Sequence, residues 1–229
     1  MPDSSIREFF DNAVDPAVRG FLHAPGTPKG NALVLSHGAG GNAQAPLLRA
    51  LADTFAAAGI TVLRCDLPYR QTRSFGPPGP GDAARDRAGL KNAIAEMKKM
   101  VTGKVFLGGH SYGGRQSSML CAELSEKEPT LVAALLLLSY PLHPPRRPEQ
   151  QRTQHLPDLH TPTLFVQGTR DPFGAIEEME RALKMIPANT KLLTIDGAGH
   201  DLGCKGRAKK EDLPSLIFSE FHEFLELSS

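Results

Sequence analysis

The chain has 229 residues, of which 40% are hydrophobic, and its 26 Lys and Arg against 25 Asp and Glu leave a net charge of +1. This length is enough for one sizeable core, so we expect a single domain over residues 1–229. The balanced charge excludes an electrostatic reason for binding nucleic acid or an anionic membrane. The longest apolar run, Leu131–Leu138, is too short to span a bilayer.

The first twelve residues, MPDSSIREFFDN, carry charges early and lack an apolar segment, which argues against a signal peptide. The three cysteines, Cys65, Cys121 and Cys204, lack metal-like spacing. An odd, low count is typical of a reduced protein, so we expect a cytoplasmic location. Cys65 and Cys121 are interpreted as small core residues, and no role is assigned to Cys204. The pattern indicates neither a metal nor an organic cofactor.

Strand-like and helix-like segments alternate along the chain. Short branched apolar runs ending in glycine predict buried strands, and apolar residues at helical spacing predict helices. Asn42 is a candidate cap for the first helix, and Asp212, followed by Pro214, for the last. The expected strands are 31–38, 61–66, 104–109, 131–141, 161–168 and 190–199, and the expected helices are 45–60, 82–101, 114–125, 175–186 and 212–228.

This alternation predicts an α/β fold with a mostly parallel central sheet, helices on both faces and no large cap domain. Residues 18–25 are a candidate edge strand or hairpin. The functional side chains of such sheets gather in loops at the carboxyl ends of the strands. The longest segment without periodicity, Leu142–His160, follows a strand, so we expect it to overhang that site.

One serine sits among glycines directly after an apolar strand. The segment Gly109-His110-Ser111-Tyr112-Gly113 is a Gly-x-Ser-x-Gly motif between a predicted strand and a predicted helix. In the nucleophile elbow, this motif places the serine on a turn too sharp for neighbours with a Cβ. We therefore predict Ser111 as a nucleophile, the alternative being an ordinary turn serine.

A serine nucleophile needs a histidine base that is held by a carboxylate, and on this fold the chain order is Ser, acid, His. Asp171 and His200 each follow a predicted strand in that order. Asp171 could instead cap a helix or form a turn, and His200 could be a surface histidine. Asp158 and Asp196 are rival acids, but neither follows a strand in the right order.

Acyl transfer also needs two backbone N–H donors for the tetrahedral oxyanion. We expect these from Tyr112 and from Ala39 in the loop HGAGGN at 37–42, with Gly38 and Gly40 as alternatives. The loop lacks the Lys-Ser/Thr pair of a nucleotide-binding P-loop. His37 and His110, which flank the site, are interpreted as structural.

These residues resemble the α/β-hydrolase superfamily from about Asn31 to the last helix. Five segments are similar to those of small bacterial hydrolase-like proteins, which are grouped with a testis-expressed vertebrate protein and a subunit of the NSL acetyltransferase complex. The segments are LVLSHGAGGN, RCDLPYRQ, GGHSYGGRQ, LLLLSYPLHPP and FVQGTRDPFG. More distantly, the chain resembles dienelactone hydrolases. The resemblance implies a triad of Ser111, Asp171 and His200. Dienelactone hydrolases use a cysteine nucleophile, so their lactone substrate is not carried over.

Two functions follow from this pattern. The first is a serine hydrolase that cleaves a small carboxylic ester or thioester through an acyl-enzyme, with transfer to an acceptor other than water left open. The second is a non-catalytic interaction module, as some vertebrate relatives are scaffolds. Loop arginines could bind an anionic acyl substrate, or pair with local carboxylates such as Asp82 and Glu149. The candidate arginines are Arg70, Arg115 and Arg147, with Arg73, Arg146 and Arg152 in the same loops.

Overall fold

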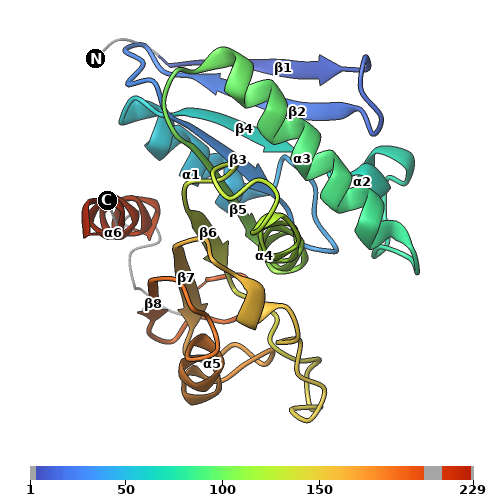
Figure 1. Cartoon of the computed structure of the whole chain (residues 1–229), viewed down its shortest axis with the longest axis vertical. Helices are drawn as coiled ribbons and strands as arrows, with labels where there is room; N and C mark the ends of the chain where they lie inside the picture. Colours follow the sequence, from blue (N-terminus) through green and yellow to red (C-terminus); the bar gives the residue numbers. More distant parts are fainter. Residues whose placement is uncertain (1–3, 204–212, 228–229) are drawn as a thin grey trace.

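The computed structural model describes residues 4–203 and 213–227, and within them eight strands form one sheet in the order β1-β2-β4-β3-β5-β6-β7-β8 (Figure 1). The strands β3 to β8 are parallel, as the alternation predicts. The bounds are β1 (Ser5–Asp11), β2 (Val18–Ala24), β3 (Ala32–Ser36), β4 (Thr61–Cys65), β5 (Val105–His110), β6 (Leu135–Leu138), β7 (Thr163–Gly168) and β8 (Thr190–Ile195).

The N-terminal segment extends one edge of the sheet. β1 and β2 form an antiparallel hairpin, and β2 pairs antiparallel with β4. The prediction of an edge strand or hairpin from residues 18–25 is therefore confirmed. At the other end of the sheet, β8 pairs only with β7 among the described strands. The site-bearing strands β3, β5 and β6 lie between these edges, where both faces of the sheet are covered.

Helices cover both faces of the sheet, which confirms the predicted fold class. α1 and α6 pack together on one face, and α3 packs with α4 on the other (Figure 1). Within the described segments no helix is long and apolar enough to cross a bilayer. The helices are α1 (Pro46–Ala57), α2 (Pro68–Thr72), α3 (Asp82–Met100), α4 (Tyr112–Leu124), α5 (Ile176–Leu183) and α6 (Leu213–Leu227), with a 3-10 turn at Leu156–Asp158.

Strand β3 shows how the sequence builds two cores at once. Successive side chains of a strand point to opposite faces of the sheet. Leu33 and Leu35 accordingly belong to the core beneath α1 and α6, whereas Val34 belongs to the core beneath α3. All three are fully buried. A continuous apolar run is therefore required here, because neither face of this central strand meets water.

Two predicted helix caps have different outcomes. Asn42 does not cap α1, because its Oδ1 accepts the Gln44 N–H at 2.9 Å and forms a local turn. α1 begins instead at Pro46, which supplies a preset φ and needs no hydrogen-bond acceptor for its nitrogen. Pro214 lies in the first turn of α6 as expected, but Asp212 lies outside the described residues. The helix expected at 114–125 begins earlier, at Tyr112.

The two cysteines within the described residues are free and buried, as predicted for core residues. Burial raises the pKa of both thiols, Cys65 and Cys121, to about 12. Because the thiolate is the nucleophile, both should be inert at pH 8. In a Cys204→Ser variant, we expect iodoacetamide to add no label to the native protein and two labels after denaturation, as measured by intact mass. Labelling of the native variant within minutes would contradict the packing of these side chains.

Candidate active site

The turn between β5 and α4 is strained at one residue. Ser111 has φ 51° and ψ −114°, a conformation that residues with a Cβ rarely adopt. Its N–H donates to the Leu138 carbonyl at 2.8 Å, and its carbonyl accepts the Arg115 N–H at 2.9 Å. The neighbouring strand and the first turn of α4 therefore hold the strained conformation from both sides.

Glycine is required on both sides of this serine because β3 passes close to the turn. A Cβ on Gly109 would lie 2.4 Å from the Ser36 Oγ and 2.7 Å from the backbone of Gly113. A Cβ on Gly113 would lie 2.5 Å from the same Oγ and 2.6 Å from the His37 carbonyl. The motif is thus explained by close packing of backbone against backbone at the end of β3.

The structure brings Ser111, His200 and Asp171 into one hydrogen-bonded chain. The Ser111 Oγ lies 2.7 Å from His200 Nε2, and His200 Nδ1 lies 2.8 Å from the Asp171 Oδ2. The other carboxylate oxygen of Asp171 accepts the Phe173 N–H at 2.9 Å. The Asp171 carboxylate is fully buried, whereas the His200 side chain is 22% exposed. The imidazole therefore stands between a buried carboxylate and a hydroxyl that faces the cavity.

Two further aromatic residues hold His200, Phe173 through its ring and His110 through its backbone. Phe173 stacks on it with ring centroids 4.1 Å apart and an interplanar angle of 27°. His110 Nε2 lies 2.7 Å from the His200 carbonyl, so this nitrogen must carry the donated proton. Burial lowers the pKa of His110, which favours the neutral ring. His110 is thus placed to position the His200 backbone, in agreement with its structural interpretation, and Phe173 carries no signal in the sequence beyond its place beside Asp171.

The two predicted oxyanion donors are the backbone N–H groups of Tyr112 and Ala39, and both residues line the cavity with Ser111. Tyr112 begins α4, so its N–H has no acceptor within the helix. The Gly38 carbonyl faces the Tyr69 hydroxyl at 3.3 Å and His37 Nδ1 at 2.9 Å. Because C=O and N–H point in opposite directions across a trans peptide, the Ala39 N–H is directed away from those partners. Because Ala39 lines the cavity, its N–H stays the predicted second oxyanion donor.

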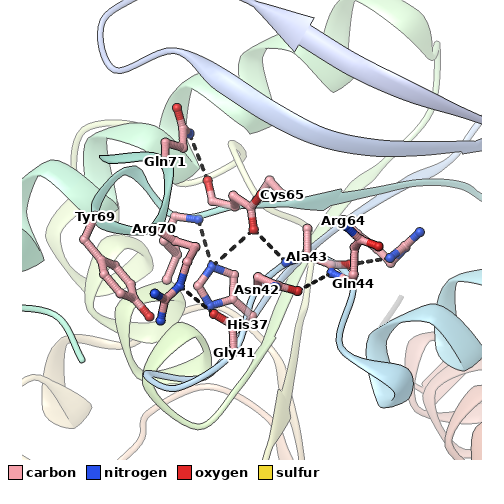
Figure 2. Close-up of polar contacts among 12 residues, drawn as sticks. His37, Gly41, Asn42, Ala43, Gln44, Arg64, Cys65, Tyr69, Arg70 and Gln71 are labelled. Carbon is pink, nitrogen blue, oxygen red and sulfur yellow. Dashed lines mark hydrogen bonds and ion pairs between the residues drawn. The ribbon is translucent and has the colours of Figure 1, made fainter. Parts of the chain in front are cut away.

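Arg70 holds the loop at 37–42 through hydrogen bonds from its guanidinium to the backbone of the loop (Figure 2). Its Nε donates to the Gly41 carbonyl at 2.8 Å, and its Nη2 donates to the Ala39 carbonyl at 3.2 Å. The remaining donors reach the carbonyls of Gly76 and Arg73 at 2.8 and 3.0 Å. The Arg70 guanidinium is therefore engaged by backbone, and Arg70 is not among the described residues that line the cavity. Arg70 therefore stabilises the loop, and the prediction that it contacts the substrate is wrong for this side chain.

His37 ties the same loop to the segment between β4 and α2. The His37 ring donates from Nδ1 to the Gly38 carbonyl and accepts the Leu67 N–H at Nε2, 3.1 Å away. Both bonds are satisfied by one neutral tautomer, and burial lowers the pKa of His37 accordingly. The neighbouring Asp66 Oδ1 accepts the Ala43 N–H at 2.7 Å, which anchors the far end of the loop (Figure 2). These contacts confirm His37 as a structural residue.

A buried carboxylate that the sequence analysis did not single out supports both halves of the oxyanion region. Asp86 on α3 is fully buried and accepts the Tyr112 hydroxyl at 2.7 Å and the Tyr69 N–H at 3.1 Å. Burial raises the pKa of Asp86, while these two hydrogen bonds lower it. The sequence did contain one signal for Asp86, which is its position one turn before Leu90 on the apolar stripe of α3. A carboxylate on a buried stripe needs partners, and here they are the residues that flank the nucleophile.

The site opens into a cavity of about 1030 Å³. Arg115 and Arg152 line this cavity, so the expectation that residues 142–160 overhang the site holds at Arg152. Arg147 is exposed and is not among the described lining residues. The apolar lining comes from residues of α1, α6 and the adjoining loops, namely Ala45, Pro46, Leu47, Leu48, Ala50, Leu202, Leu213 and Pro214, with Pro141 and Phe173 nearer the loops after β6 and β7.

Comparison with known proteins gives a family and a shared fold. Residues 29–223 match the family described as alpha/beta hydrolase domain. A dienelactone hydrolase from Anabaena variabilis is 20% identical, with a TM-score of 0.72 and 98% of each chain covered. Est1E from Butyrivibrio proteoclasticus is 17% identical, with a TM-score of 0.71 over 96% of this chain and 99% of its own. XC6422 from Xanthomonas campestris, described as a serine hydrolase without lid, is 16% identical, with a TM-score of 0.67 over 97% and 95%.

The close packing around the elbow predicts the effect of one added methyl group. Gly109→Ala should lower the free energy of unfolding by about 1–3 kcal/mol, because the new Cβ meets backbone atoms that cannot rotate away. Gly40→Ala is the matched control, since a Cβ there meets nothing within 4 Å, and we expect a change within about 0.5 kcal/mol. Urea unfolding followed by circular dichroism measures both. Equal stabilities of the two variants would contradict the proximity of β3 to the turn.

Proposed function

The chain belongs to the alpha/beta hydrolase domain family, and from that premise we propose that it is a serine hydrolase that cleaves a carboxylic ester or thioester through an acyl-enzyme. The observation that carries this proposal is the hydrogen-bonded chain from the Ser111 Oγ through His200 to Asp171, at 2.7 and 2.8 Å. Its place beside a large, mostly apolar cavity supports a small organic substrate.

Acylation uses the three side chains in sequence. The Ser111 Oγ attacks the substrate carbonyl carbon while His200 Nε2 takes the hydroxyl proton. Asp171 keeps the Nδ1–H of His200 oriented and stabilises the imidazolium that forms. The carbonyl oxygen becomes an oxyanion that accepts the N–H groups of Tyr112 and Ala39. As the tetrahedral intermediate collapses, His200 returns the proton to the departing alcohol or thiol, and an ester joins the acyl group to Ser111.

Deacylation repeats these steps with water as the nucleophile. His200 Nε2 removes a proton from water, and the resulting hydroxide attacks the acyl carbon bound to Ser111. The same backbone donors hold the second oxyanion. The bond to Ser111 then breaks, its Oγ recovers a proton from His200, and a carboxylic acid leaves. An alcohol or amine acceptor in place of water would make the same site an acyltransferase.

Substitution of the triad tests this function directly. We expect wild-type protein to hydrolyse 4-nitrophenyl butyrate or the corresponding acyl thioester. Asp171→Asn should lower kcat by about 10⁴ and Ser111→Ala by about 10⁶. Ser125→Ala, at the opposite end of α4, is a matched control that should retain the wild-type rate. If folded wild-type protein hydrolyses neither substrate class faster than Ser111→Ala does, the interaction module replaces the hydrolase as the leading function.

The hydrogen bonds from Arg70 to the 37–42 loop predict a separate kinetic effect. Arg70→Met keeps the aliphatic stem but removes the donors to the Ala39 and Gly41 carbonyls, so the Ala39 N–H loses its fixed direction. We expect kcat for a neutral ester to fall about tenfold with little change in KM, because an oxyanion donor acts in the transition state. Arg73→Met is the control, since Arg73 is 44% exposed and forms an ion pair with Asp82.

The same pair of variants separates this role from substrate binding. A rise in KM that is confined to anionic esters, with kcat retained, would contradict the loop-holding role of Arg70. It would instead restore Arg70 as a substrate contact. Thermal unfolding of Arg70→Met shows whether the fold is intact at the assay temperature.

A further inference from the structure

Arg115 enters the cavity from the helix that carries the nucleophile. It lies one turn after Ser111 on α4, and its N–H donates to the Ser111 carbonyl. Helical side chains lean toward the helix N-terminus, so the Arg115 stem runs back toward Ser111. The Arg115 Nε is buried and has no hydrogen-bond partner among the described residues. The Nε itself is closed to solvent, so an acceptor in the cavity can meet only the terminal nitrogens of this guanidinium, which also lies beside the Tyr140 hydroxyl.

Arg152 reaches the same cavity from the loop after β6 and is held firmly. Its N–H donates to the Leu142 carbonyl at 2.8 Å, and its carbonyl accepts the Tyr140 hydroxyl at 2.8 Å. Its Nη1 donates to the Pro141 carbonyl at 3.1 Å. Burial lowers the pKa of Arg152, and the nearby charge of Arg115 lowers it further. The two guanidinium groups are therefore neighbours that repel each other.

No carboxylate among the described residues forms an ion pair with Arg115 or Arg152. His155, which is hydrogen-bonded to Ser118 on α4, has its pKa lowered to about 4 by burial and by the charge of Arg115, so it is neutral at pH 7. Asp201 also lines the cavity, where its Oδ1 accepts the Gly203 N–H. Two half-buried cations thus share one wall of the cavity without a paired anion, unlike Arg87, which pairs with Glu123.

The opposite wall of the cavity has a different chemistry. Leu47 and Ala50 on α1 and Leu213 and Pro214 at the start of α6 line it with apolar side chains. α1 and α6 cover one face of the sheet, and α4 covers the other. Ser111 lies at the end of β5, between these faces. The cavity therefore has a basic side toward α4 and an apolar side toward α1 and α6.

We propose that Arg115 and Arg152 bind a carboxylate of the substrate, so that the ester has an anionic group on the α4 side of the scissile bond and an apolar group on the other. This inference rests on the proposed hydrolase function. The planar guanidinium fork matches the two oxygens of a carboxylate, and one anion between two cations relieves their repulsion. Charge and shape would then select the substrate together.

Matched esters that differ by one charge test the inference. Mono-4-nitrophenyl glutarate, whose carboxylate lies in the acyl group, is compared with its neutral methyl ester. The butyrate ester of 3-hydroxybenzoate, whose carboxylate lies in the leaving group, is compared with the butyrate ester of methyl 3-hydroxybenzoate. In wild-type protein we expect kcat/KM for the charged member of one pair to exceed that of its neutral partner. The pair that responds identifies the side of the scissile bond on which the carboxylate lies.

Variants then assign the preference to the two arginines. Arg115→Gln and Arg152→Gln should each lower the charged-to-neutral ratio of kcat/KM by about tenfold or more, because each removes half of the carboxylate site. Arg147→Gln removes the same charge from the same loop at an exposed position outside the cavity, and should change the ratio less than twofold. If one of the two variants fails to fold, the other still decides the result.

A binding measurement separates failure of this site from failure of the hydrolase. Calorimetric titration of glutarate into Ser111→Ala needs no catalysis, and we expect binding that is weakened about tenfold or more by Arg115→Gln or Arg152→Gln. Retention of the wild-type ratio and of glutarate binding in both variants would overturn the inference. If no ester is hydrolysed but arginine-dependent glutarate binding remains, the anion site stands and the hydrolase does not.

Discussion

The strained backbone at Ser111 is the constraint on which the rest of the site depends. A positive φ at a residue with a Cβ costs on the order of 1–3 kcal/mol, and it persists here because the Leu138 carbonyl and the first turn of α4 fix both sides. This turn presents the hydroxyl to His200 and starts α4 at once, so that the Tyr112 N–H stays unbonded within the helix. The glycines at 109 and 113 follow from the same requirement, because β3 leaves no room for their side chains.

The loop at 37–42, which carries the other predicted oxyanion donor, is held by buried polar side chains. Arg70 donates to four backbone carbonyls, two of them in this loop, His37 joins the loop to the residue before α2, and Asp86 links Tyr69 to Tyr112. Each of these polar side chains is buried, and each would be destabilising without its partners. These contacts fix the orientation of the loop backbone before any substrate binds. Electrostatic stabilisation of a transition state requires such a preorganised backbone.

The sequence predicted the parts of this molecule that depend on local pattern. Strand–helix alternation and the Gly-x-Ser-x-Gly motif were enough to indicate the fold and to select Ser111, Asp171 and His200, which the structure places in hydrogen-bond contact. The roles of the arginines were harder to predict, because a sequence places them on loops or on a helix but does not show where their side chains point. Arg70 turns inward to carbonyls and Arg147 points to solvent, whereas Arg115 and Arg152 reach the cavity. Asn42 failed as a cap because a proline already started the helix.

The central claim is that Ser111 is an activated nucleophile, and covalent labelling tests it most directly. A fluorophosphonate reagent is added to wild-type protein and to Ser111→Ala, and intact mass is recorded for each. We expect a single adduct on the wild type and none on the variant, since the reagent reacts with a serine only where a base and an oxyanion site are in place. A folded wild-type protein that gains no adduct, or an adduct that survives in Ser111→Ala, would contradict it.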